Sequence, residues 1–253
     1  LSSGGISCYL DKKMDVYAYK TIDSTNTQMK KFAVDNHVNY ALIVAEHQSA
    51  GRGRFNRNFY SPEKQGIYMS LLLRYDQTFN DATLITIQSA VAIKRVIKKL
   101  YGIDTKIKWV NDLYYQSKKI CGILTEAISD FESGMIEAII IGIGINVSTK
   151  QFPEELLDKA TSLGIENINR CKFIALIVNE IFKIIDEDFD NVLNEYKDAS
   201  CVLNKKVEFR YKGQIYNGIA KDINNLGNLI VKCDNQEYTL NSGEVSIIQK
   251  NYE

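Results

Sequence analysis

Residues 136–147 read IEAIIIGIGINV, a nearly continuous apolar run. A short apolar run between polar segments is typical of a strand that is buried on both faces. We therefore expect this stretch to lie at the centre of a sheet. A membrane-spanning helix needs about 20 apolar residues, and this run is shorter and is interrupted by Glu137, Gly142, Gly144 and Asn146. No membrane partner is predicted.

On both sides of this run, apolar and alternating patterns predict further strands. They are Val16 to Tyr19, Ala41 to Glu46, Ile67 to Arg74, Lys106 to Tyr115 and Ile120 to Ala127. The last two flank the polar turn 116–119, which predicts a hairpin.

Helical spacing of apolar residues predicts four helices. The first runs to about Asn36 and starts at 24–28, where Thr25 and Gln28 have the spacing of a capping box. The others are residues 81–101, a short helix 154–159 after Pro153, and a long amphipathic helix from Arg170 to about Ala199.

The pattern changes after Cys201 to short alternating stretches that are separated by turn residues. Such a segment without helices is typical of a small β-barrel or curled sheet. The predicted fold is therefore of the α+β class, with a mixed sheet flanked by helices in residues 1–200. A small C-terminal β-barrel domain is expected in residues 201–253.

Composition excludes several classes of protein. Lys and Arg together number 31, as do Asp and Glu, so binding to nucleic acid through overall charge is not expected. The five cysteines are widely spaced, which favours free thiols in the cytoplasm over a disulfide framework or a zinc site. Only two histidines are present, and no HExxH motif occurs.

A basic loop is the sharpest local feature. Residues 51–57 read GRGRFNR, with three arginines and two glycines in seven positions. Arginine binds phosphate and carboxylate through two parallel hydrogen bonds, and glycines let backbone N–H groups approach an anion. Taken alone, the same loop is better explained as a solvated basic surface or as a contact to RNA.

The hairpin brings unlike charges together. Asn111 and Asp112 lie on its first strand, and Lys119 lies at the base of the second. A carboxylate and an ammonium group at one sheet edge suit a nucleotide with its Mg²⁺. Taken alone, however, they are better explained by a surface ion pair beside a turn.

Two further features lie near predicted strand ends. The glycines of Gly142-Ile143-Gly144-Ile145-Asn146 indicate close approach of a ligand or of another backbone segment. Asn146 is interpreted either as a ligand contact or as a strand-end residue. Phe59 and Tyr60, just past the basic loop, are placed to lie against a flat ring.

The order of five motifs adds more than any one of them. They are Asp23-Ser24-Thr25-Asn26; Glu46 to Arg54 with Arg57 and Ser61-Pro62; Lys108-Trp109-Val110-Asn111-Asp112; Lys119 to Leu124; and Gly142 to Val147. Together they resemble the catalytic module of biotin protein ligases, from about residue 16 to the end of the chain. The helix-turn-helix domain at the front of some members is absent from this sequence, so no DNA partner is expected.

The resemblance implies an ATP-dependent ligase. Biotin and ATP would give biotinyl-5′-AMP and pyrophosphate, and a lysine of a biotin carrier domain of a carboxylase would then displace AMP to form an amide bond. Lys119, Arg54 and Asp112 would be the catalytic residues, with Mg²⁺ near Asp112. The residues implied to bind biotin or ATP are Ser24, Thr25, Asn26, Gln48, Gly51, Arg52, Gly53, Arg54, Arg57, Phe59, Asn111, Lys119, Gly122 and Asn146.

Two residues depart from the family pattern. Val110 stands where the family usually has proline, and Phe59 where it usually has tryptophan. The alternatives are a lipoate or octanoate ligase and, in another class, a nucleic-acid-binding module that uses the basic loop. The basic loop and the C-terminal domain favour biotin. The resemblance is also compatible with a homodimer.

Overall fold

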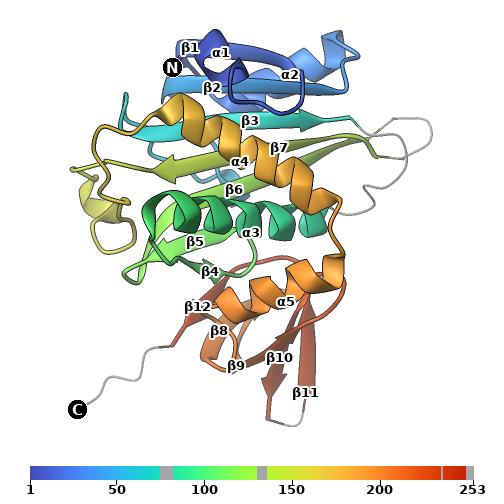
Figure 1. Ribbon diagram of the computed structural model, residues 1–253. Coiled ribbons are helices and arrows are strands. Elements are labelled where there is room, and N and C mark those ends of the chain that lie inside the picture. Colours follow the sequence, from blue (N-terminus) through green and yellow to red (C-terminus); the bar gives the residue numbers. More distant parts are fainter. Residues whose placement is uncertain (75–81, 130–135, 235, 249–253) are drawn as a thin grey trace.

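The computed structural model describes residues 1–74, 82–129, 136–234 and 236–248 (Figure 1). A mixed sheet of seven strands has the order β1-β2-β3-β7-β6-β5-β4, in which only β1 and β2 run parallel. Its strands are β1 (Asp15–Ile22), β2 (Tyr40–Gln48), β3 (Gly66–Leu73), β4 (Lys106–Lys108), β5 (Asp112–Tyr115), β6 (Lys118–Ser129) and β7 (Ile136–Asn146).

The apolar run 136–147 forms the central strand, as predicted. β7 pairs with β3 on one side and β6 on the other. Ile139, Ile140 and Ile141 are all fully buried, so both faces of the strand are covered. This explains why the run shows no polar alternation.

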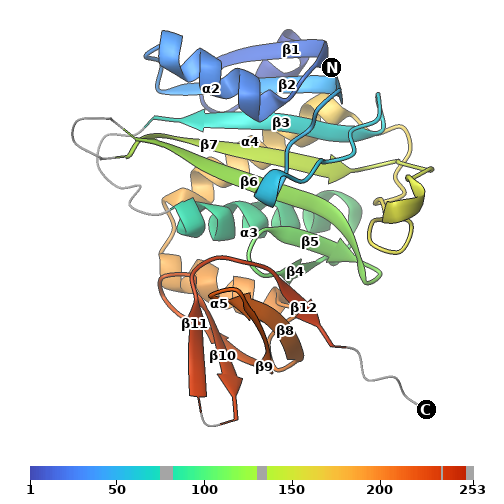
Figure 2. The ribbon, with the colours of Figure 1, turned by 180° about the vertical axis from the view of Figure 1, so that it is seen from behind.

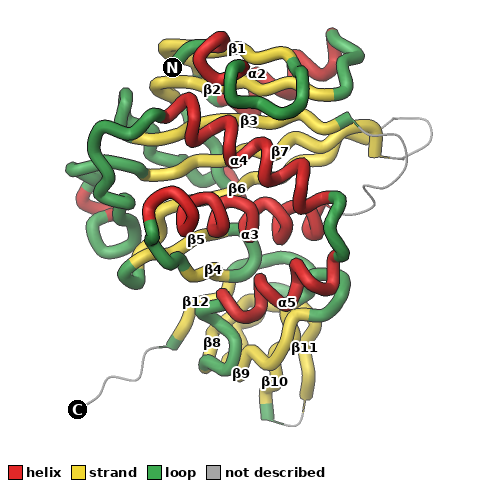
Figure 3. Tube along the Cα trace, in the orientation of Figure 1, coloured by secondary structure: helices red, strands yellow, loops and turns green. Residues whose placement is uncertain are grey.

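Helices cover the two faces of the sheet unequally. α1 (Ser3–Ser7), α3 (Ala82–Tyr101) and α4 (Arg170–Ile185) lie on one face, and α2 (Thr25–Asp35) lies on the other (Figures 1 and 2). Figure 3 shows α3 and α4 crossing the same side of the strands. The larger core lies under α3 and α4, whereas a small one, including Met29 and Ile140, lies under α2. The α2 face therefore retains room for a cavity.

The expected capping box at the start of α2 is wrong. Ser24 is the N-cap residue, and its side chain makes no capping hydrogen bond. Gln28 Nε2 donates instead to Asp23 Oδ1 at 2.7 Å, and the Thr25 backbone N–H donates to Gln48 Oε1 at 2.8 Å. Gln48, on β2, thus accepts from the helix-terminal N–H of Thr25, for which the sequence spacing predicted Gln28 as the partner.

The single strand expected at 106–115 is also wrong. This stretch folds into β4 and β5, an antiparallel pair in which Lys108 lies opposite Asp112. The turn between them contains Trp109, Val110 and Asn111, with a cis peptide bond between Trp109 and Val110. The expected hairpin between 115 and 118 is present, because β5 pairs with β6.

The long helix expected at 170–199 is two helices. α4 ends at Ile185 and α5 (Phe189–Ala199) starts after Asp188, whose Oδ1 accepts the Asn191 backbone N–H at 3.2 Å. An N-cap aspartate in the middle of an amphipathic pattern restarts the helix in a new direction. The short helix expected at 154–159 is reduced to a 3₁₀ turn, Glu154–Leu156.

The C-terminal all-β domain is present. Its antiparallel sheet has the order β11-β10-β9-β8-β12, formed by β8 (Lys206–Tyr211), β9 (Gln214–Ile223), β10 (Leu229–Cys233), β11 (Gln236–Leu240) and β12 (Val245–Ile247). α5 lies between this sheet and the main one (Figure 1). The domain boundary at residues 200 and 201 remains a prediction. In the described residues, no helix is long and apolar enough to span a membrane.

Arg95 joins the three helices that meet above the C-terminal sheet. From α3 its guanidinium reaches Glu180 of α4 at 3.2 Å, Glu187 of the connection at 2.9 Å and Glu195 of α5 at 2.7 Å. The hydrogen bonds from Arg95 lower the pKa of Glu187 below its ordinary value of 4.5. The charged form of this carboxylate therefore stabilises the fold.

We predict that Arg95→Met lowers the free energy of unfolding by about 1–3 kcal/mol at pH 7, since three partly buried carboxylates lose their partner. A lowered carboxylate pKa contributes stability above pH 4.5 that is lost as the pH falls through the lowered value. The difference from the unmodified chain should therefore shrink at pH 3 in urea titrations. Lys94→Met, which breaks one ion pair with Asp104, is the control; equal losses in both variants would contradict a special role for Arg95.

Candidate functional site

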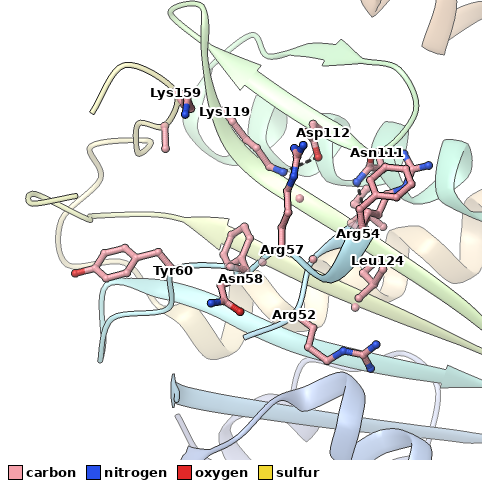
Figure 4. A pocket seen from close by; sticks show the side chains of 18 of the residues that line it. Arg52, Arg54, Arg57, Asn58, Tyr60, Asn111, Asp112, Lys119, Leu124 and Lys159 are labelled. Carbon is pink, nitrogen blue, oxygen red and sulfur yellow. Dashed lines mark hydrogen bonds and ion pairs between the residues drawn. The ribbon is translucent and has the colours of Figure 1, made fainter. Parts of the chain in front are cut away.

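A cavity of about 750 Å³ opens on the α2 face of the main sheet. Its walls come from the start of α2, the loop after β2, the strands β5 to β7, the loop after β7 and the C-terminal segment 243–246 (Figure 4). Every candidate residue from the sequence lines it except Gly51. Those present are Ser24, Thr25, Asn26, Gln48, Arg52, Gly53, Arg54, Arg57, Phe59, Asn111, Asp112, Lys119, Gly122 and Asn146.

Gly51 lies beneath the cavity wall. A Cβ atom there would lie 2.5 Å from the Phe59 carbonyl oxygen and 2.8 Å from Ser61 Oγ. The Phe59 backbone N–H donates to the Gly51 carbonyl at 2.8 Å. Gly51 therefore lets the basic loop fold closely onto the chain that follows it.

Glycines on neighbouring strands form the cavity floor. Gly122 of β6 lies opposite Gly144 of β7. A Cβ at Gly144 would lie 2.5 Å from the Phe59 ring, and one at Gly142 would lie 2.0 Å from Asn26 Oδ1. The missing side chains let a ring and an amide lie directly on the sheet.

The inner end of the cavity is a hydrogen-bonded polar network. Gln48 Oε1 accepts from both the backbone N–H and the hydroxyl of Thr25, and Gln48 Nε2 donates to Ser61 Oγ at 2.9 Å. Ser70 Oγ lies 2.8 Å from Thr25 Oγ1 and also contacts Asn26 Oδ1. These groups are buried, so their orientations are fixed.

Sequence analysis missed Ser70, which contacts the lining residues Thr25 and Asn26. The sequence does contain a signal for Ser70. Residues 67–73 read IYMSLLL, and Ser70 is the one small polar residue in this apolar stretch. Ser61 was noted only as part of a motif.

The carboxylate of Glu126 lies behind the cavity wall and contacts two lining residues, Asn26 and Arg52. Glu126 accepts from Asn26 Nδ2 at 3.0 Å and pairs with Lys30 at 2.7 Å and Arg52 at 3.4 Å. Burial by itself raises the pKa of Glu126, but the bonds from Lys30 and Asn26 outweigh it and lower the pKa. The Arg52 guanidinium consequently points away from Lys119 (Figure 4).

Lys119, Asp112 and Arg54 form a cluster of charged side chains, here called the charged centre, between β5, β6 and the basic loop. Lys119 Nζ lies 2.8 Å from Asp112 Oδ1, as the hairpin prediction requires. Arg54 Nη1 donates to Asn111 Oδ1 at 3.1 Å, and Asn111 Nδ2 donates to the Ile123 carbonyl at 2.9 Å (Figure 4). Burial lowers the pKa of Arg54, while the nearby Asp112 charge opposes this. Two cations therefore face one cavity from opposite segments.

Arg57 is held by the C-terminal domain. Its guanidinium makes two contacts with the carboxylate of Glu244, in the segment between β11 and β12. Both side chains are at least half exposed, so the pair is screened by solvent and weak. Sequence analysis missed Glu244, since no local pattern relates residues so far apart in the chain.

The loop after β7 forms another wall of the cavity. It carries Lys159, which sequence analysis also missed (Figure 4). The Lys119 backbone N–H donates to the Lys159 carbonyl, and the Thr161 N–H donates to the Lys119 carbonyl, both at 2.9 Å. Asn146 Nδ2 donates to the Thr161 carbonyl at 3.1 Å. Asn146 Oδ1 is buried and, among the described residues, has no hydrogen-bond partner. It is an acceptor that a ligand donor would satisfy.

The β4–β5 turn below the charged centre is fixed from the far side. Trp109, buried as core, donates its Nε1–H to the Gly227 carbonyl at 2.9 Å, and the Tyr196 hydroxyl donates to the Val110 carbonyl at 2.9 Å. Burial raises the pKa of Tyr196 well above its ordinary value, so its hydroxyl remains a donor.

Family models match both parts of the chain. Residues 18–146 match the model described as "Biotin/lipoate A/B protein ligase family". The chain belongs to this family. Residues 202–247 match "Biotin protein ligase C terminal domain", which narrows the family to its biotin-ligase branch.

Individual relatives agree with this family assignment. The bifunctional ligase/repressor BirA of Bacillus spizizenii is 44% identical over 145 residues, 56% of this chain and 44% of its own. The chain thus spans less than half the length of that relative. The biotin--[acetyl-CoA-carboxylase] ligase of Mycobacterium tuberculosis is 27% identical, with 92% of this chain and 88% of its own covered. The structure of the Aquifex aeolicus biotin protein ligase in complex with biotin and ATP matches with a TM-score of 0.80 and 25% identity, covering 93% of this chain and 99% of that one.

We predict that Tyr196→Phe destabilises this biotin-ligase fold by about 1–3 kcal/mol, because the buried Val110 carbonyl loses its partner. Tyr216→Phe is the matched control, since its hydroxyl bonds the exposed Gln214 side chain and no buried carbonyl among the described residues, and we expect a change within about 0.5 kcal/mol. Chemical denaturation measures both. Similar values for the two variants would show that the turn does not depend on the Tyr196 bond.

Proposed function

We propose that this protein ligates biotin to a lysine of an acceptor protein, using ATP and forming biotinyl-5′-AMP. The observation that carries the proposal is the Lys119–Asp112 pair with Arg54 in one cavity that has a polar inner end and a glycine floor. Membership of the family supports it, as does the bound biotin and ATP of the Aquifex relative.

The inner end of the cavity suits the ring system of biotin. Thr25 and Gln48 offer fixed hydroxyl and amide groups that match a cyclic urea, which both donates and accepts hydrogen bonds. A flat bicycle lies closely on a sheet only where side chains are absent, which Gly142 and Gly144 provide. Phe59, now over Gly144, would shift to cover the ring.

The first step joins two anions and so requires neutralising charge. A biotin carboxylate oxygen attacks the α-phosphorus of ATP, the bond to the pyrophosphate oxygen breaks, and pyrophosphate leaves. Lys119 and Arg54 would hold the carboxylate and the α-phosphate in line and offset the developing charge. Asn146, whose Oδ1 has no hydrogen-bond partner in the part of the chain that the structure describes, would accept a hydrogen bond from the adenine amino group.

Magnesium would arrive with the ATP phosphates. In the described residues, no group of three or more His, Cys, Asp and Glu side chains could hold a metal ion. Asp112 is a single carboxylate beside the charged centre, and Mg²⁺ commonly binds through one or two carboxylates plus phosphate oxygens. When bound, the ion would neutralise phosphate charge.

The basic loop would act as a cover. The Gly53 N–H bonds the Arg57 carbonyl at 2.8 Å, so the loop folds back on itself above the cavity. Closing this loop over the mixed anhydride would exclude water, which otherwise hydrolyses it. We further propose a biotin carrier domain of a carboxylase as acceptor, the cytoplasm as location and a homodimer through open sheet edges.

The first experiment measures exchange of labelled pyrophosphate into ATP with biotin, lipoate or octanoate. Exchange with biotin alone is the expected result. Exchange with lipoate or octanoate alone would keep the chemistry and overturn the substrate. Absence of exchange with every acid, in a folded sample, would overturn the function, and salt-sensitive RNA binding would then favour the nucleic-acid alternative.

We predict that Lys119→Met reduces biotin-dependent exchange by about 100- to 1,000-fold, because a preorganised cation at the reacting centre is lost. Its unfolding free energy should change by no more than about 1 kcal/mol, as the ion pair is partly exposed. Lys118→Met is the control, since this lysine bonds the Leu157 carbonyl outside the cavity. Near-normal exchange by Lys119→Met would remove Lys119 from the mechanism.

A further inference from the structure

Glu126 is a half-buried carboxylate that contacts residues of the cavity without lining it. It lies on β6, opposite Ile140 of β7, and its side chain meets Asn26 and Lys30 of α2. Only 18% of the side chain is exposed. A carboxylate in such a place has fixed partners, so it determines which way the polar groups beside it can point.

The two oxygens of Glu126 have different partners. Oε1 accepts from Lys30 Nζ at 2.7 Å and from Arg52 Nη2 at 3.4 Å, whereas Oε2 accepts from Asn26 Nδ2 at 3.0 Å. An ionised carboxylate can only accept hydrogen bonds. The amide nitrogen of Asn26 must therefore face Glu126, and it also donates to the Leu124 carbonyl at 3.2 Å.

This orientation directs Asn26 Oδ1 to the buried hydroxyl of Ser70. A hydroxyl has one proton to donate, and that of Ser70 goes to Asn26 Oδ1. The Thr25 hydroxyl lies 2.8 Å from Ser70 Oγ and 3.1 Å from Gln48 Oε1, and it donates to one of them. In either case no described side chain donates to Thr25 Oγ1, so its lone pairs are available to an N–H group in the cavity.

We propose that Glu126 is a positioning residue for the ring system of biotin, acting through Asn26 and Ser70 on the Thr25 hydroxyl. The inference rests on the proposed function. Glu126 fixes the order of donors and acceptors along this chain of side chains, and that order leaves an acceptor for an N–H of the cyclic urea. Lipoate and octanoate carry no such N–H, so the same order favours biotin over both acids.

Glu126→Gln changes the direction of the hydrogen bonds at nearly constant shape. The glutamine oxygen should face Lys30 and Arg52, because both are cations. The glutamine amino group would then face Asn26 Nδ2, and two donors cannot pair. Asn26 should therefore turn its amide over and donate to Ser70, whose proton would move onto Thr25 Oγ1 and occupy the acceptor.

We expect Glu126→Gln to raise the KM for biotin in pyrophosphate exchange at least tenfold. The kcat should stay within threefold, and the KM for ATP within twofold, of the values for the unmodified chain. Lys30→Met is the matched control, because it removes the nearest cation from the same carboxylate and leaves the bond to Asn26 intact. Its KM for biotin should stay within threefold, and urea titrations should show that both variants fold.

Ser70→Ala tests the route of the effect, because it removes the hydroxyl proton that would turn onto Thr25. In the double variant with Glu126→Gln, the KM for biotin should return to within threefold of the value for Ser70→Ala alone. A tenfold difference between these two proteins would overturn the proposal.

Equal effects of Glu126→Gln and Lys30→Met, an unchanged KM for biotin in Glu126→Gln, or a loss of kcat in place of the rise in KM would also overturn the positioning role. Absence of exchange by the unmodified chain would instead overturn the proposed function, so the two failures are distinguishable.

Discussion

The ion pair between Lys119 and Asp112 is the constraint that the elements around the cavity satisfy together. The hairpin places Asp112 opposite Gly122, and the Lys119 side chain reaches along the strands until its Nζ lies 2.8 Å from Asp112 Oδ1. Asp112 follows the turn that Tyr196 and Gly227 hold from the side of the C-terminal sheet. Lys119 is bonded through its backbone to the loop after β7. Elements from both ends of the chain thus determine one charge-to-charge distance.

Two parts of the cavity, its glycine floor and its polar inner end, depend on the main sheet. β7 is covered on both faces yet lacks side chains at Gly142 and Gly144, so the sheet is rigid where a ligand ring would lie. Rigid apolar support beneath a cationic centre is an effective arrangement for reactions between anions, because the charges need little reorganisation. The polar groups of Thr25 and Gln48 are fixed by the same sheet, through β2 and the helix it caps.

Local patterns predicted the features that depend on local physics. The buried strand 136–146, the hairpin that joins Asp112 to Lys119 and the change to short strands after 201 all follow from hydrophobic periodicity and turn composition. Predictions failed where a distant residue replaced a local one. Gln48, for example, accepts from the Thr25 backbone N–H, which the expected capping box would have paired with Gln28.

Three further features lay beyond the sequence pattern. Asp188 restarts a helix whose apolar spacing continues across the break. Lys159 reaches the cavity on a loop without regular structure, and Glu244 does so from another domain. Spacing along the chain does not encode such distant contacts. Motifs therefore predicted the residues of the cavity floor and of the charged centre, but not those of its outer walls.

The contact at Gly227 has a consequence for how the two parts of the chain can vary. Gly227 has a φ of 76°, and a Cβ there would lie 2.7 Å from Ile87 of α3. Its carbonyl also accepts from the Trp109 indole. A chimaera that borrows its C-terminal sheet from a relative would need a residue here that fits both the left-handed backbone and the close contact with α3. The C-terminal sheet therefore cannot be exchanged independently of α3 and the β4–β5 turn.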